Sequence, residues 1–143
     1  MRLNLVILLI CLSVPMIGMS QTMDWQQASN WRLYDTIGSA DHFTIDSLNN
    51  YRYINLDQAS MRGFLINDSL LPSERTKNAV WMGFYRVSCR IADKTKILIV
   101  SRYGGFFADL ATRQYYQIPI SQISDWNAYL DTQFSDLHKS TAH

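Results

Sequence analysis

Cysteine is nearly absent from this chain of 143 residues, which holds only Cys11 and Cys89. Cys11 lies in a leading segment that we expect to be removed, so a single thiol would remain. One cysteine excludes a disulfide within the chain, and the alternating pattern around Cys89 predicts a buried, inert thiol rather than a nucleophile. Export without a disulfide fits a bacterial envelope better than a small cystine-rich secreted scaffold.

Signatures of metal, nucleotide and hydrolytic chemistry are also missing. His42, His138 and His143 have no paired spacing on a helix, so no metal site and no cofactor are predicted. There is no Gly-x-Ser-x-Gly elbow, phosphate-binding loop or dinucleotide fingerprint. Asp41 precedes His42, but neighbouring strand residues point to opposite faces, which is poor geometry for a proton relay. The sequence therefore favours a protein without catalytic activity, although catalytic sites need not carry a motif.

Charge of one sign is equally lacking. The chain has 13 Lys and Arg against 12 Asp and Glu, a formal net charge of +1 at pH 7. Neither sign forms a run or a stripe along the sequence. This balance argues against nucleic acid as a partner and against a solvated acidic tail.

The one long apolar run is at the start of the chain. Residues 1–20, MRLNLVILLICLSVPMIGMS, place Arg2 before an apolar stretch that Pro15 interrupts. The stretch falls short of the roughly 18 clean apolar residues of a membrane span. It is typical of a secretory signal peptide with cleavage before Gln21. We therefore expect a single domain over residues 21–143, in the periplasm or at the cell surface, without a stable membrane span.

A hairpin around Gly104-Gly105 is the centre of the predicted fold. Residues 95–103 alternate between two faces and are rich in β-branched side chains, which indicates a strand. The two glycines tolerate the positive φ of a tight turn, and with them as the loop Ile99 is expected opposite Leu110. In a second interpretation the glycine pair is a kink within one long strand, and residues 110–114 form the turn.

The strand before this hairpin should pair with it so that apolar residues share a face. A three-residue loop at 92–94 pairs Cys89 with Ile97. A two-residue loop would instead set Cys89 against Lys96, so we reject it. Residues 79–118 are thus expected to form an antiparallel meander of about four strands.

The flanking segments predict further elements. A short helix is expected at 22–29, a polar loop at 67–78, and four more short strands at 31–34, 42–46, 51–57 and 61–66. After Pro119 the apolar residues recur every three or four positions, which predicts an amphipathic helix over about 121–138 packed on the sheet. Its apolar stripe consists of Ile123, Trp126, Leu130, Phe134 and Leu137.

The predicted fold is mainly β (α+β): an antiparallel meander of about eight strands, as a barrel-like or strongly curved sheet, with the C-terminal helix packed on it. This layout resembles that of the lipocalins, an eight-stranded cup with a flanking helix. The resemblance covers the layout alone, because Ser29-Asn30 precedes Trp31 where lipocalins have Gly-x-Trp. An open antiparallel sheet wrapped on the last helix is the alternative.

Aromatic and arginine side chains around two predicted turns are the candidate binding residues. If exposed, they could stack on a sugar or seat a protein partner, whereas if buried they are ordinary core. These candidates are Arg102, Tyr103, Phe107, Tyr115 and Tyr116.

Together these features predict an exported binding protein of the bacterial envelope, without catalytic activity, whose ligand is a small apolar or glycan molecule. The alternatives are a periplasmic inhibitor or immunity-type protein that binds another protein, and a small secreted hydrolase.

Overall fold

The computed structural model describes residues 23–36, 43–66, 70–72, 84–109 and 111–139. Its strands form one antiparallel sheet of seven strands, counting the two-residue β3, in the order β2-β1-β4-β5-β6-β7-β3. The described sheet is open, with β2 and β3 at its edges. An antiparallel sheet with a C-terminal helix is therefore confirmed, while eight strands and a closed barrel are not found in this part of the chain.

The strands are β1 (Ser29–Tyr34), β2 (Tyr53–Asn55), β3 (Leu71–Pro72), β4 (Phe84–Ile91), β5 (Lys94–Ser101), β6 (Phe106–Asp109) and β7 (Gln114–Gln117). The helices are α1 (Gln58–Phe64) and α2 (Ile123–Lys139), and the 3-10 helices are η1 (Trp25–Gln27), η3 (Ile45–Asn50) and η6 (Ile120–Gln122).

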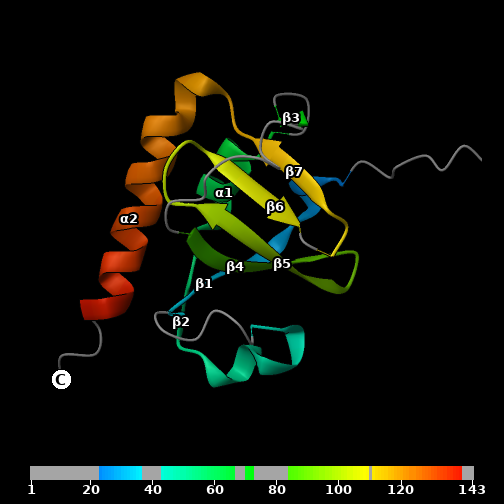
Figure 1. Cartoon of the computed structure of the whole chain (residues 1–143), viewed down its shortest axis with the longest axis vertical. Coiled ribbons are helices and arrows are strands. Elements are labelled where there is room, and N and C mark those ends of the chain that lie inside the picture. The colour runs from blue at the N-terminus through cyan, green and yellow to red at the C-terminus, as the bar shows by residue number, and fades with distance from the viewer. Residues whose placement is uncertain (1–22, 37–42, 67–69, 73–83, 110, 140–143) are drawn as a thin grey trace, which may run out of the picture.

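Two helices and η1 cover one face of the sheet, which we call the core face. Figure 1 shows α2 running along the sheet, as the apolar stripe predicts. Its Trp126 and Leu130 join Met61 of α1 and Trp25 of η1 in one buried cluster. The strand residues of that cluster are mainly apolar: Trp31, Leu33, Tyr85, Val87, Cys89, Leu98, Val100 and Phe107. α2, α1 and η1 thus bury apolar side chains against this face of the sheet, which stabilises the fold.

The β4–β5 turn corrects the predicted register. Ala92 and Asp93 form a two-residue turn with φ of 47° and 61°, as a type I′ hairpin requires. Cys89 therefore pairs with Lys96, so the predicted partner Ile97 was wrong. The lysine is tolerated on the core face because its ammonium group lies 3.2 Å from the buried carboxylate of Asp109. Both faces of β5 carry apolar residues, so the sequence of β5 does not decide which face is buried. The charge of Asp109, in another strand, decides it.

The β5–β6 connection also differs in length. Residues 102–105 form the loop, so Ile99 pairs with Ala108 and the expected two-glycine register was wrong by two residues. A shift of two keeps Ile99 and Ala108 on one face, as the predicted register does, but the core face is the other one, with Leu98, Val100 and Phe107. Gly104 and Gly105 have φ of 86° and 66°, so they turn the chain and are no kink within one strand. A Cβ on Gly105 would lie 2.7 Å from the Ile118 side chain, which explains why glycine is needed there.

Two predicted strands are helices instead. In the first, residues 45–46 already belong to η3, and a capping box of Thr44 and Ser47 stands at the start of that helix. The segment 61–66 belongs largely to α1, because the Asp57 side chain accepts a hydrogen bond of 2.7 Å from the backbone N–H of Ser60 and starts a helix. In both places cap chemistry outweighs a short apolar pattern, which alone does not separate strand from helix.

The remaining expectations agree in part. The first described helix is η1, shorter than predicted, and its cap is Asp24. Of the expected loop at 67–78, only residues 70–72 are described, and β3 lies there. The rest of that loop and His42 lie outside the described residues.

Candidate binding site

The second face of the sheet, opposite α2, carries a pocket of about 250 Å³. Alternate residues of β1 and β4 point into it, because side chains of a strand alternate between faces, and Cys89 of β4 and Thr95 of β5 also reach it. Leu48 of η3 completes the lining, and η3 packs against β5 beside it. We call this site the sheet pocket; it is lined by Asn30, Arg32, Tyr34, Leu48, Ser88, Cys89, Arg90 and Thr95.

A bulge in β1 shapes the pocket. Ser29 pairs with Arg90 and Arg32 with Ser88, so β1 holds one residue more than β4 across this stretch. Asn30 absorbs the extra residue with φ of 52°, a conformation that asparagine adopts more readily than most residues. Bulges bend a strand and re-aim its side chains, which here opens a hollow in an otherwise regular ladder.

The floor of the pocket is fixed by a buried hydrogen bond. The hydroxyl groups of Tyr34 and Ser88 lie 2.9 Å apart. The Tyr34 ring contacts Phe43 and Tyr53 at centroid distances of 5.1 and 5.8 Å, and Phe43 contacts Tyr51 at 5.0 Å. This aromatic cluster ties the chain on both sides of η3 to the sheet, so the pocket is preformed on the strand side.

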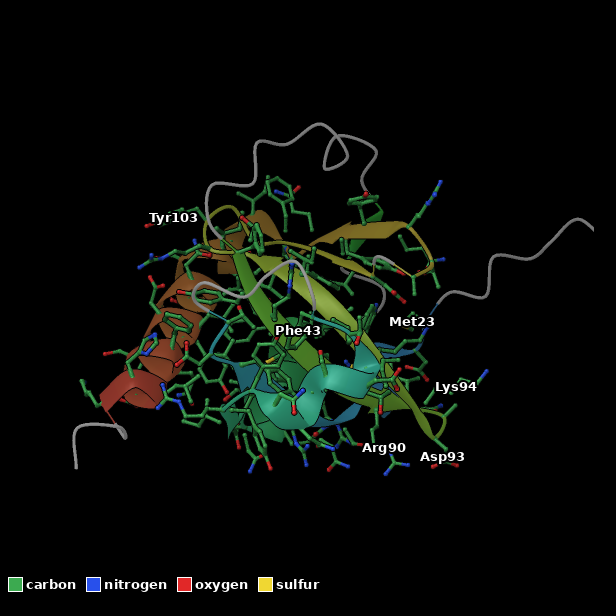
Figure 2. All side chains as sticks on the ribbon, turned by 60° about the horizontal axis from the view of Figure 1, so that its bottom comes forward. Met23, Phe43, Arg90, Asp93, Lys94 and Tyr103 are labelled. Atoms are coloured by element: carbon green, nitrogen blue, oxygen red, sulfur yellow. The ribbon has the colours of Figure 1, made fainter. Side chains whose placement is uncertain are left out.

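The pocket is positively charged. The Arg32 guanidinium lies over the Tyr53 ring, 4.4 Å from its centroid, a cation–π contact that holds it in place. Arg90 is half exposed, and its Nη2 lies 3.6 Å from a carboxylate oxygen of Asp93, whose side chain is fully exposed. Among the described lining residues two are arginines and none is acidic. Figure 2 shows η3 in front of the sheet, with Arg90 and Asp93 at the neighbouring β4–β5 hairpin.

A second hollow of about 310 Å³ lies between the two α-helices. Its apolar part is formed by Phe64 and Tyr129, whose rings are 5.8 Å apart. Ser60, Gln122 and Asp125 supply polar groups at its edge. It is a mixed groove with one acid and no base among its described residues, in contrast to the sheet pocket.

The five residues predicted from sequence do not form one surface. Phe107 lies in the core, edge-on to Trp25 at 5.3 Å and stacked on Tyr116 at 5.0 Å. Tyr115 is half-buried and alternates with Tyr116, so it belongs to the second face. Tyr103 is 56% exposed in the β5–β6 loop.

Arg102, beside Tyr103 in that loop, is tied to α2. Its Nε lies 3.4 Å from Asp131, which also accepts a hydrogen bond from the partly buried Tyr85 hydroxyl. Burial, and then the carboxylate of Asp131, raise the pKa of Tyr85. The loop is thereby fixed against the helix, and Tyr103 is its exposed apolar side chain.

Sequence reasoning missed the sheet pocket. The available signal was polar alternation, Asn30-x-Arg32 in one strand and Ser88-x-Arg90 in another. Such alternation is ordinary for a solvated sheet face. Only the pairing of β1 with β4 brings the two patterns together, and that pairing joins residues nearly sixty positions apart.

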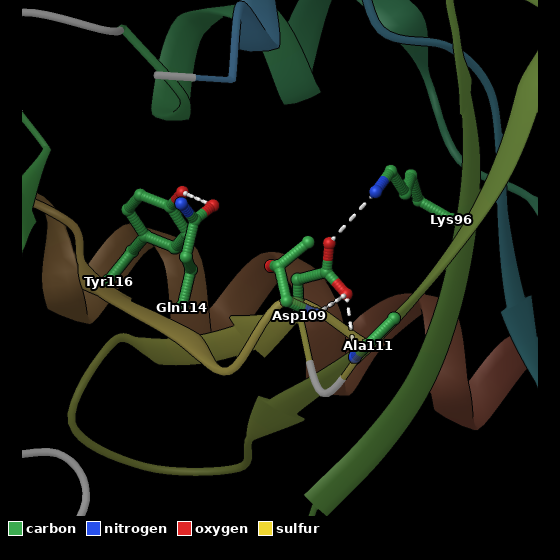
Figure 3. Close-up of polar contacts among 6 residues, drawn as sticks. Lys96, Asp109, Ala111, Gln114 and Tyr116 are labelled. Carbon is green, nitrogen blue, oxygen red and sulfur yellow. Dashed lines mark hydrogen bonds and ion pairs between the residues drawn. The ribbon is translucent and has the colours of Figure 1, made fainter. Parts of the chain in front are cut away.

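A polar cluster lies at the end of the core face (Figure 3). The Asp109 side chain is fully buried; one oxygen lies 3.2 Å from the Lys96 ammonium, and the other accepts hydrogen bonds from the N–H groups of Ala111 and Thr112 at 3.0 and 3.4 Å. Beside it, Tyr116 donates a 2.7 Å hydrogen bond to Gln114. The carboxylate thus closes the β6–β7 turn and neutralises the lysine, which is a structural role.

The buried Cys89 thiol lies near this cluster. Burial, and then the Asp109 carboxylate, raise the pKa of Cys89 to about 12, although Lys96 opposes the rise. Because the thiolate is the nucleophilic form, a thiol with such a pKa is inert near neutral pH.

No protein-family model, curated protein or solved structure matches the chain. Among the described residues, no group of three or more His, Cys, Asp or Glu could hold a metal ion. In the same part of the chain, no helix has the length and apolar character needed to cross a membrane. Asp41, His42 and His143 lie outside the described residues, and His138 lies on α2 with Nδ1 3.6 Å from Asp35.

Proposed function

We propose that this chain is an exported bacterial binding protein without catalytic activity, and that its ligand is a small glycan or a similarly polar molecule held in the sheet pocket. The observation that carries the proposal is the convergence of alternate polar residues of β1 and β4, with Thr95 of β5, on one preformed hollow. The leading segment, with its single arginine and broken apolar run, supports export.

The chemistry of the lining supports a hydroxyl-rich ligand over an apolar one. Guanidinium groups donate hydrogen bonds, and the Asn30 amide and the Ser88 and Thr95 hydroxyls both donate and accept. At about 250 Å³ the pocket is below the roughly 300–1,000 Å³ typical of drug-sized ligands. A single sugar ring, or one residue of a longer glycan that continues into solvent, is the class of ligand that we propose.

Binding without turnover is the better match to this lining. Glycoside hydrolysis generally uses two carboxyl groups on either side of the scissile bond. The described residues around the pocket supply cations and neutral donors, with no carboxyl group among them. A hydrolase would therefore need its acid and base from elsewhere in the chain.

A titration with monosaccharides tests the proposal. Chemical shifts of backbone amides in the purified protein would be followed while neutral and acidic sugars are added, and saturable shifts are expected for β1, β4 and β5. Thr95→Tyr places a ring in the pocket and should abolish these shifts. Ser135→Tyr, on the exposed side of α2, is the matched control and should leave them unchanged. Equal binding by both variants, or binding by neither variant nor wild type, would contradict the proposal.

A protein partner is the second candidate, and the exposed Tyr103 favours it. Tyr and Arg are frequent anchors of protein interfaces, and Arg102 stands beside Tyr103 in a loop fixed by Asp131. An inhibitor-type protein would lose its target on Tyr103→Ala and keep it on Thr95→Tyr. If a partner of known identity is instead lost on Thr95→Tyr and kept on Tyr103→Ala, the sheet pocket is the binding site.

A further inference from the structure

We infer that the sheet pocket selects a ligand with an anionic group, a carboxylate or a phosphate or sulfate ester, held between Arg32 and Arg90. This inference rests on the proposed function and names the chemical class of its ligand. The two arginines come from adjacent strands, one on each side of the β1 bulge, and both line the same hollow. A pocket of this size with two guanidinium groups is suited to an acidic sugar.

Arg32 is the preorganised member of the pair. Its guanidinium is held over the Tyr53 ring, and it makes no hydrogen bond or ion pair with any residue in the described part of the chain. A cation in a partly enclosed site is unfavourable without an opposite charge. The guanidinium fork can donate two parallel hydrogen bonds to a carboxylate or phosphate, so an anionic ligand supplies the partner that the described residues do not.

Arg90 has only a weak ion-pair partner. Its contact with Asp93 is long, at 3.6 Å, and the aspartate side chain is fully exposed to water. Exposed ion pairs of this kind contribute little to stability, so a ligand anion can displace Asp93. Asp93 consequently acts as a competitor that lowers the affinity of the pocket for anions.

Neutral donors complete the site. Asn30 and Thr95 flank the arginines, and Ser88 contributes a hydroxyl whose position is set by Tyr34. Hydroxyl groups of a sugar can bind here while its acidic group binds the arginines. This division of roles predicts preference for an acidic sugar over its neutral counterpart.

The test compares galacturonate with galactose by isothermal titration calorimetry, with inorganic phosphate and sulfate as ester probes. Galacturonate should bind at least roughly tenfold more tightly than galactose, since charge-assisted hydrogen bonds are about twice as strong as neutral ones. Its affinity should fall as salt is raised. If only phosphate or sulfate binds, the anionic group of the ligand is a phosphate or sulfate ester. If galacturonate alone binds, that group is a carboxylate.

Three variants locate the anion. Arg32→Gln and Arg90→Gln should each lose roughly tenfold in galacturonate affinity, while Arg62→Gln, an exposed arginine of α1, should not change it. Asp93→Asn should strengthen binding severalfold, and asparagine suits the positive φ of 61° at that turn position. No gain from Asp93→Asn would overturn the assignment of Arg90 to the anion. Thermal melts identify any variant that fails to fold, and the gain expected of Asp93→Asn is not produced by misfolding.

The outcomes separate this inference from the proposed function. Equal binding of galactose and galacturonate, unaffected by Arg32→Gln, would leave the glycan site in place and overturn the anion preference. Binding of neither sugar, phosphate nor sulfate would overturn both.

Discussion

Removal of the Asp109 carboxylate should strongly destabilise the fold. Asp109→Ala leaves the Lys96 cation, 22% exposed, without its partner on the core face, and leaves the N–H groups of Ala111 and Thr112 without their acceptor. Loss of one buried partner of an ion pair costs about 3–5 kcal/mol, which partial exposure of the lysine reduces to about 1–2 kcal/mol. The turn hydrogen bonds add about 1–2 kcal/mol. The expected loss of about 2–4 kcal/mol is a large part of the stability of a small domain.

Two further variants divide this loss into its charge and turn components. Asp109→Asn keeps an oxygen for the turn N–H groups and removes the charge, so it should cost about 1–2 kcal/mol less than alanine. Lys96→Met removes the cation while keeping a long apolar stem. The Asp109→Asn, Lys96→Met pair should recover part of the loss, because a well-packed apolar side chain often replaces a buried ion pair at little cost.

Urea unfolding followed by tryptophan fluorescence is the assay. Trp25 contacts Phe107 and Tyr116 in the same end of the core, so its emission reports on the packing there. Asp136→Ala, which removes an exposed ion pair with Lys139 on α2, is the control and should cost under about 0.5 kcal/mol. If Asp109→Ala proves as mild as that control, the structural role given to the cluster is refuted.

Three other predictions concern single residues. Tyr85→Phe removes the hydrogen bond to the Asp131 carboxylate and should cost about 1–2 kcal/mol in thermal unfolding. Cys89, with a pKa raised to about 12 by burial, should not react with a disulfide reagent at pH 8 until the protein unfolds. Gly105→Ala should destabilise by about 2 kcal/mol or more, because φ is 66° and a Cβ would meet two isoleucines, whereas Gly63→Ala in open space on α1 should stabilise by about 0.5–1 kcal/mol.

The pH dependence for Cys89 follows from the higher pKa of the folded state. Folding favours the neutral thiol, so its contribution to stability is complete below the unfolded pKa of 9.0 and is lost as the pH rises toward about 12. Cys89→Ala should flatten this part of the stability profile. Rapid labelling of the native thiol, an unchanged melting temperature for Tyr85→Phe, or a tolerated Gly105→Ala would each contradict the corresponding prediction.

The register of β5 shows where sequence reasoning was insufficient. Both faces of residues 96–101 are apolar enough to enter a core: Ile97 and Ile99 on one, Leu98 and Val100 on the other. Lysine at position 96 argued for the first choice. The structure has the second because Asp109, in a different strand, neutralises that lysine. No local pattern contains this information.

The candidate site was missed for a related reason. Aromatic residues near the predicted turns were the conspicuous feature, yet Phe107 and Tyr116 pack in or beside the core. Asn30 and Arg90, which line the sheet pocket, look like ordinary surface residues in sequence. Their meeting depends on the pairing of β1 with β4 across the bulge.

By itself the sequence determined the local periods: alternating strands in its second half, a glycine-pair turn, and the three-and-four spacing that places Trp126 and Leu130 of α2 on the core. Tertiary structure alone decided which face of β5 is buried and that Arg32 and Arg90 share a pocket. The physical reason is that periods arise from backbone geometry within a few residues, whereas register and site depend on charges and packing contributed by distant strands.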